Sequence, residues 1–223
     1  MVRRSHNPEE PRLPRSVSNS PDLLPTVDAE LLQLVLQGDF SNRRCTRMTI
    51  EESQIVGSSF AGADLSELRM TDVVVEGTDF SGADLERASL SRVGFTDCRM
   101  SGVLIPRAHL RDVTFSECKL DGANFRMSQA ERVRFDHVDL RAAEFSAGHL
   151  AWASFFDCDL ADSEWSHTHV PGGRFHGSSI GDIKGGEYLR DIVIDSSQVV
   201  PLALRVFAGL GISVNDQRDP PGS

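Results

Sequence analysis

Residues 60–85 read FAGADLSELRMTDVVVEGTDFSGADL, with a large apolar residue at every fifth position. The same period runs from Phe40 to Ile180. All twenty-nine positions at multiples of five in that range are apolar, although apolar residues make up only 39% of the chain. Most positions two residues before each such centre hold a small residue, such as Ala63 or Ala83, and glycine is common two residues after it. The fold is therefore encoded with a period of five residues.

A period of five fits neither a regular α-helix, which needs 3.6 residues, nor a simple strand, which needs two. It suits a chain that bends at every repeat, with one large and one small residue pointing inward and a corner at which glycine allows positive φ. Four repeats would close a square coil of twenty residues, and neighbouring coils would pair as parallel strands about 4.8 Å apart. Sorting the sequence by twenty supports this, because it places Phe95, Phe115, Phe135, Phe155 and Phe175 in one column.

The repeat also carries a family resemblance. Gly62-Ala63-Asp64-Leu65, Gly82-Ala83-Asp84-Leu85 and Gly122-Ala123-Asn124-Phe125 resemble the A(D/N)LXX signature of pentapeptide repeat proteins. The resemblance extends over residues 38–182 in one register. It implies an all-β fold, the right-handed quadrilateral β-helix (a pentapeptide repeat solenoid), here with about seven coils and a C-terminal helical cap.

The segments outside the repeat are predicted to be caps and tails. The predicted divisions are a disordered tail at 1–27, a strand or cap at 28–37, the β-helix at 38–182, a C-terminal cap and dimerisation segment at 183–214, and a tail at 215–223. The first tail is rich in Pro, Ser and Arg and poor in apolar groups, which is typical of disorder. In the C-terminal cap, Asp195 and Gln198 have the spacing of a capping box, and Pro201 is expected to kink or restart the helix.

The C-terminal end carries a second, shorter resemblance. Residues 193–198 and 210–214 are similar to the end of Qnr-type and mycobacterial quinolone-resistance pentapeptide repeat proteins. That resemblance implies a homodimer joined through the C-terminus and a rod that resembles B-DNA and binds DNA gyrase. Val200, Leu204 and Phe207 are the residues expected to face the partner subunit.

Composition narrows the classes of function. The formal net charge of −10 argues against direct nucleic-acid binding, which needs clustered Lys and Arg. The sequence contains no apolar run long enough to span a membrane and no secretory signal, so a cytoplasmic location is expected. No nucleophile–base motif, phosphate loop or metal signature is apparent. We therefore expect no enzyme activity, no cofactor and no metal.

Acidic residues form the candidate partner-binding edge. Glu76, Asp97, Glu117, Asp136 and Asp157 are expected at equivalent corners of five successive coils. Asp79, Asp139 and Asp159 are expected on the adjoining side, where Arg99 and Lys119 interrupt the row. This edge is interpreted either as a solvated surface that keeps the rod soluble or as an imitation of DNA.

Other side chains have competing interpretations. Trp152 and Phe156 stand at turn positions and form either a partner-binding patch or a locally covered pair, with Arg132 stacked on Trp152 through a cation–π contact. His109, His149 and His169 share one outward column, with His167 nearby, and are read as surface histidines in preference to a metal site. Cys98 and Cys118 are neighbours in one ladder and are read as buried thiols in preference to a disulfide. Cys45 and Cys158 complete a set of cysteines without CxxC spacing.

The sequence thus predicts a non-catalytic protein-interaction scaffold. The alternative is a DNA mimic that modulates DNA gyrase or another DNA-binding protein.

Overall fold

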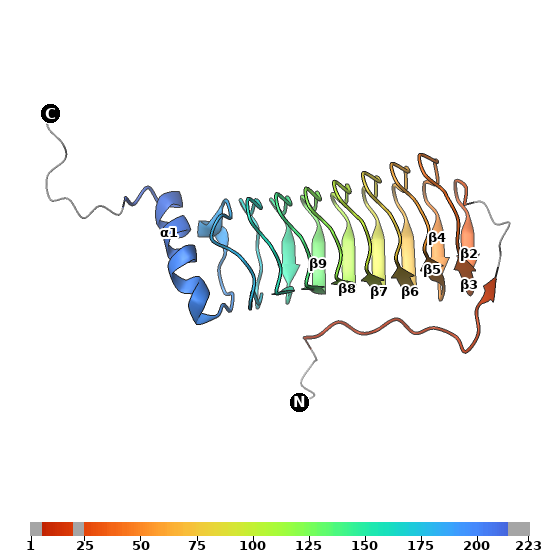
Figure 1. Cartoon of the computed structure of the whole chain (residues 1–223), viewed down its shortest axis with the longest axis horizontal. Helices are drawn as coiled ribbons and strands as arrows, with labels where there is room; N and C mark the ends of the chain where they lie inside the picture. Colours follow the sequence, from red (N-terminus) through yellow and green to blue (C-terminus); the bar gives the residue numbers. More distant parts are fainter. Residues whose placement is uncertain (1–5, 20–24, 214–223) are drawn as a thin grey trace, which may run out of the picture.

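The computed structural model describes residues 6–19 and 25–213, which form a long rod (Figure 1). Its body is one parallel sheet of eleven strands wound into coils. The strands are β1 (Ser18–Asn19), β2 (Glu30–Leu32), β3 (Leu34–Leu36), β4 (Thr49–Glu51), β5 (Gln54–Val56), β6 (Arg69–Glu76), β7 (Ser89–Thr96), β8 (His109–Ser116), β9 (Gln129–Asp136), β10 (His149–Ala151) and β11 (Ser154–Phe156). Two 3-10 turns, η1 (Gly186–Tyr188) and η2 (Ser196–Gln198), lead into the helix α1 (Val199–Gly209).

From β4 and β5 to β10 and β11 the coils stack with a register of twenty residues, and the step from β2 and β3 to β4 and β5 is nineteen. Leu90 of β7 pairs with Leu110 of β8, and Phe115 of β8 pairs with Phe135 of β9. The pairing advances six times from β2 and β3 to β10 and β11, which makes about six turns of paired strands. Isolated bridges such as Glu164 to Lys184 continue the winding. The predicted parallel β-solenoid is confirmed, and its strand-paired part is slightly shorter than the seven coils expected.

The core contains the residues at multiples of five, which stack in four columns, together with the small residues two positions before them. Each of these centres from Phe40 to Ile180 is buried, with at most 4% of its surface exposed. Phenyl rings of successive coils stack face to face: the centroids of Phe95 and Phe115 are 4.9 Å apart, and those of Phe135 and Phe155 are 4.8 Å apart. Burying one aromatic ring per coil in this way stabilises the rod along its whole length.

Every corner of the coil needs a residue with positive φ. This residue stands two positions after each centre, and it is glycine at Gly82 and Gly122 but a larger residue at Asp97 and Ala142. Glycine adopts this conformation without steric cost, whereas other residues are strained. The glycine spacing in the sequence therefore reflects the positive φ that the backbone adopts at each corner.

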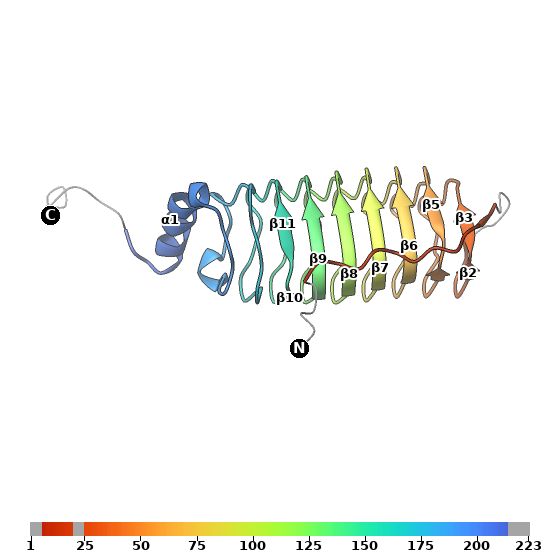
Figure 2. The same ribbon diagram turned by 90° about the horizontal axis from the view of Figure 1, so that it is seen from below.

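The structure corrects the expectation for the N-terminal tail. Residues 6–19, expected to be disordered, lie extended along the outside of the solenoid from β9 back to β3 (Figure 2). At their end, β1 pairs with β3 and covers the exposed edge of the first coil. Residues 1–5, 20–24 and 214–223 lie outside the described part, and the predicted tail at 215–223 falls there.

The C-terminal cap closes the other end. Asp195 and Gln198 form the predicted capping box, and the buried amide of Gln198 donates a hydrogen bond of 2.6 Å to the Ser178 carbonyl. Pro201 lies in the first turn of α1, which runs through it as one helix, because a first-turn residue needs no intrahelical N–H bond. Leu202 packs on the core. Among the described residues, no helix is long and apolar enough to cross a membrane.

Candidate functional site

The acidic edge occupies one corner of the rod, but in two adjacent columns. Glu76 pairs with Thr96, which is in register with Ser116 and Asp136. Asp97, Glu117 and Asp157 lie one residue further on. The expectation of five equivalent positions is therefore wrong by one residue, since the step from Glu76 to Asp97 is twenty-one residues and the coil is twenty.

The carboxylates of this corner differ in their surroundings. Glu76, Asp97, Glu117 and Asp157 are exposed, whereas Asp136 is half-buried. Arg134 donates hydrogen bonds to Asp136, and His137 contacts it at 2.9 Å. Burial alone would raise the pKa of Asp136, but these two partners lower it below its ordinary value. The Asp136 carboxylate is therefore already paired within the chain. The acidic side chains of this corner that face solvent are those of Glu76, Asp97, Glu117 and Asp157.

The adjoining row is a mixed column of acids and bases. The bridges run Asp79, Arg99, Lys119, Asp139, Asp159, so the predicted interruption by Arg99 and Lys119 is present. Arg141 donates to both oxygens of Asp139 and, as the largest cause, lowers the pKa of that carboxyl. Ser179 donates to Asp159. This row has less charge available to a partner than the first corner.

The histidine column forms as predicted. His109, Gln129, His149 and His169 are in register, and the rings of His149 and His169 are 6.4 Å apart. A hollow of about 510 Å³ lies over this wall, lined among others by His109, Gln129 and His149. His167 instead lies against Tyr188, at 4.6 Å between ring centroids.

Metal-ligating side chains of the described part gather elsewhere, at Asp136, His137 and Asp157, whose ligand atoms lie within 4.8 Å of one another. Arg134 already donates a hydrogen bond to the half-buried Asp136 there, so one of the three possible ligands is held in an ion pair.

The two candidate aromatics are covered by other partners than expected. His6 stacks on Trp152 with ring centroids 3.8 Å apart and an interplanar angle of 16°. Arg132, the expected partner, binds Asp112 instead. The cation–π contact is made at Phe156, where the Arg134 guanidinium lies 4.9 Å from the ring centroid.

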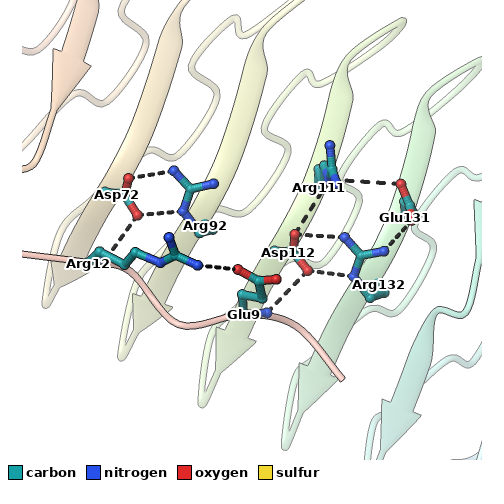
Figure 3. A network of polar contacts seen from close by, with 8 residues as sticks. All are labelled: Glu9, Arg12, Asp72, Arg92, Arg111, Asp112, Glu131 and Arg132. Atoms are coloured by element: carbon teal, nitrogen blue, oxygen red, sulfur yellow. Dashed lines mark hydrogen bonds and ion pairs between the residues drawn. The ribbon is translucent and has the colours of Figure 1, made fainter. Parts of the chain in front are cut away.

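A ladder of alternating charge with buried aspartates and partly exposed arginines, which the sequence analysis missed, runs along the corner between the two halves of the long strands (Figure 3). Its members are Asp72, Arg92, Asp112 and Arg132, each twenty residues from the next. Arg92 Nε lies 2.6 Å from Asp72 Oδ1, and Arg132 Nε lies 2.7 Å from Asp112 Oδ1. Only 3% of the Asp112 side chain is exposed. Sorting charged residues by twenty, as was done for the phenylalanines, would have revealed the alternation.

The N-terminal segment completes this ladder. The backbone N–H of Arg12 donates to Asp72 Oδ1 at 2.9 Å, and that of Glu9 donates to Asp112 Oδ1 at 3.1 Å. The hydrogen bond from Arg92 is the main cause that lowers the pKa of Asp72. Burial would raise the pKa of Asp112, but hydrogen bonds from Arg132 and Glu9 outweigh it and lower the pKa. Both carboxylates are thus stabilised in their charged form.

The four cysteines are buried free thiols, as was predicted for Cys98 and Cys118. Burial raises the pKa of the Cys158 thiol to about 11. The neighbouring Cys118 thiol and burial together raise the pKa of Cys98. These thiols act as core groups.

The residues expected to face a partner subunit lie on the outer side of α1. Val200, Leu204 and Phe207 are 67%, 51% and 39% exposed. Val199 and Leu210, at the two ends of the same helix, are exposed as well. The last position of the C-terminal resemblance, Val214, lies outside the described residues.

Comparison with known protein families matches most of the repeat, between residues 69 and 184. The family described as "Pentapeptide repeat region" matches residues 88–165 and 108–184, and that described as "Pentapeptide repeats (8 copies)" matches residues 69–105. No curated protein matches the sequence.

Several solved structures are similar. Full-length QnrB1, a plasmid-mediated fluoroquinolone resistance protein, is 20% identical, with 82% of this chain and 100% of that chain covered and a TM-score of 0.43. HetL, a pentapeptide repeat protein involved in heterocyst differentiation regulation in the cyanobacterium Nostoc, is 16% identical, with 70% and 84% covered and a TM-score of 0.29. A pentapeptide repeat protein of the Arabidopsis thaliana thylakoid lumen is 17% identical, with 67% and 73% covered and a TM-score of 0.23.

Proposed function

Because the chain belongs to the pentapeptide repeat family, we propose that it is a non-catalytic scaffold that binds a protein partner on the outside of its rod. The observation that carries the proposal is the acidic corner. Glu76, Asp97, Glu117 and Asp157 are exposed along one edge, supported by a backbone that is paired coil by coil. A rigid edge of this kind binds a basic surface with little ordering cost.

The partner is a protein with a basic groove, and the finer form of the proposal is DNA mimicry. Coils repeat every 4.8 Å or so along the rod, whereas phosphates along one DNA strand repeat about every 3.4 Å. The corner therefore imitates a charged edge and not individual phosphates. DNA gyrase is the candidate partner, on the resemblance of residues 193–198 and 210–214 to quinolone-resistance proteins of this family.

Charge reversal on the corner tests this function. The variant Asp97→Lys, Glu117→Lys, Asp157→Lys should lose partner binding and keep its fold, because these side chains point to solvent. Asp136 stays unchanged, since its reversal would break the contacts with Arg134 and His137. Binding by the parent should weaken as salt rises, because the attraction is electrostatic.

A matched control carries the same change of charge on the other three corners. Glu52→Lys, Glu67→Lys, Asp162→Lys also replaces residues at positive φ. Both triple variants and the parent are compared in capture of partners from cytosol and in supercoiling assays with purified gyrase. Equal loss in both variants would show a general charge effect and contradict the proposal. Partner binding without any effect on gyrase would support the scaffold and reject the gyrase form.

A homodimer joined through α1 and a cytoplasmic location belong to the same proposal. The exposed apolar side of α1 supports the first, and the buried free thiols suit the reducing environment of the second.

A further inference from the structure

The N-terminal segment contacts the rod at every third residue. His6 stacks on Trp152, the Glu9 N–H binds Asp112, and the Arg12 N–H binds Asp72. The three partners on the rod are each forty residues apart. The segment and the solenoid thus share a common register, with opposite chain direction (Figure 2).

This match has a geometric cause. Two coils of a parallel β-solenoid advance about 9.6 Å, and three residues of polyproline II helix advance about 9.3 Å. Prolines stand at Pro8, Pro11 and Pro14, which is the spacing that places them on one side of such a helix. Pro11 lies over Gly94 of β7, where a side chain would reach within 3.9 Å of its ring. A proline-rich segment is therefore in step with every second coil.

The rod presents the matching acceptors ready-made. Asp72 and Asp112 are held in place by Arg92 and Arg132, through bonds in which the segment takes no part (Figure 3). The Trp152 ring rests on the backbone of Gly172, where a Cβ would come within 2.2 Å of it. We call the carboxylates of Asp72 and Asp112 and the ring of Trp152, taken together, the Asp72–Asp112–Trp152 track. It is preorganised, which lowers the cost of binding an extended ligand.

The charged side chains of the segment point away from the rod. The side chains of Glu9 and Arg12 pair with each other at 2.8 Å and are 55% and 72% exposed. The track recognises backbone N–H groups and one ring, so a different chain with the same spacing can make the same bonds. The residues of the segment are exposed or half-buried, and a surface segment of this kind opens locally at low cost.

We propose that the Asp72–Asp112–Trp152 track is a binding site for extended proline-rich segments of partner proteins. Such a segment carries N–H donors three residues apart and a ring three residues before the first donor. Residues 6–15 are its internal occupant, and a partner segment binds by displacing them. This site is separate from the acidic corner and does not depend on the function proposed there.

The full-length variant Glu9→Pro, Arg12→Pro tests the site, because proline keeps an extended chain but has no N–H to donate. The probe is a fluorescein-labelled peptide, His-Asn-Pro-Glu-Glu-Pro-Arg-Leu-Pro-Arg-Ser, which has the sequence of residues 6–16. The variant should bind this peptide at least roughly tenfold more tightly than the parent in fluorescence anisotropy, because an internal competitor lowers the apparent affinity of the parent. The control variant Glu10→Pro, Leu13→Pro should behave like the parent.

A second peptide examines the donors without altering the protein. It carries proline in place of the residues equivalent to Glu9 and Arg12, and it should not bind. In the parent, amide hydrogen exchange at Glu9 and Arg12 should be slower than at Glu10 and Leu13, because only the first two amides donate to the track. The proposal is overturned if Glu9 and Arg12 exchange as fast as Glu10 and Leu13, if the released track does not bind the first peptide, or if both peptides bind equally.

Discussion

The residue two positions after each apolar centre lies at a corner of the coil, and its backbone conformation determines the local strain. It has positive φ in every repeat, from Asn42 to Gly177. Gly122 and Ala142 occupy the same corner in successive coils, with φ of 64° and 54°. A side chain added at Gly122 would meet no atom within 4 Å, so the effect of a substitution there comes from the backbone alone.

This pair gives a reciprocal prediction. Gly122→Ala should lower the free energy of unfolding by about 1 kcal/mol, and Ala142→Gly should raise it by a smaller amount, because a Cβ is strained at positive φ. Urea denaturation of the two variants and the parent measures both changes. Changes of the same sign in the two variants would contradict the assignment of the corner.

Substitutions at inward-facing and outward-facing positions should have very different effects on the free energy of unfolding. Phe135→Ala should cost about 3–5 kcal/mol, the usual range for removing a buried phenyl ring, because it removes one ring from the stack. Asp97→Asn, at an exposed corner, should change stability by less than about 0.5 kcal/mol. Thermal unfolding of both proteins gives the comparison, and equal losses would be incompatible with the fold.

Among the elements, the C-terminal cap with helix α1 has two sides, one that packs on the rod and one that faces outward. Leu202 packs on the core and Gln198 bonds the last coil, so this side of the cap closes the rod. The opposite side keeps Val200, Leu204 and Phe207 exposed. An exposed edge of stacked strands would otherwise invite association, and the cap replaces it with a helix face that can pair in a defined way.

Dimerisation is expected through that face. Light scattering at tens of micromolar should give twice the mass of the chain for the parent and the single mass for Leu204→Glu, because a charge opposes burial of the helix face. Leu32→Glu is the control, since Leu32 is 59% exposed at the far end of the rod. A monomeric parent would count against the dimer, as would a dimeric Leu204→Glu.

For the molecule as a whole, the charge ladder ties four coils and the N-terminal segment together. Asp72 and Asp112 each accept bonds from an arginine of the next coil and from the segment. Buried ion pairs add little by their mere presence, but breaking one leaves an unpaired charge behind. The ladder therefore contributes more to positioning the N-terminal segment than to the free energy of unfolding.

The ladder predicts a pH dependence with a definite sign. Because the folded pKa of Asp112 is lowered, the unfolded chain binds more protons near pH 4, and stability falls as the pH drops through the folded pKa. Asp112→Asn should cost up to about 3 kcal/mol at neutral pH. The difference from the parent should stay constant above about pH 4, near the unfolded value, and shrink below it. Thermal unfolding from pH 7 to pH 3 tests this, and a difference that grows with acidity would refute it.

The sequence by itself determined the solenoid, its inward positions and the capping box. These features rest on local chemistry: the centre of each repeat must be apolar, the corner must accept positive φ, and like residues must stack at twenty. A requirement repeated in every coil leaves a periodic signal that one sequence suffices to show. The fold class and the burial of Phe40 through Ile180 follow from that signal.

Only the tertiary structure decided how the surface is used. The course of residues 6–19 and the stacking of His6 on Trp152 have no periodic apolar pattern to reveal them. The N-terminal segment is recognised through backbone N–H groups, which every residue except proline possesses, so no side chain marks the docked residues. Such contacts exist only once the coils have brought Asp72, Asp112 and Trp152 into one line.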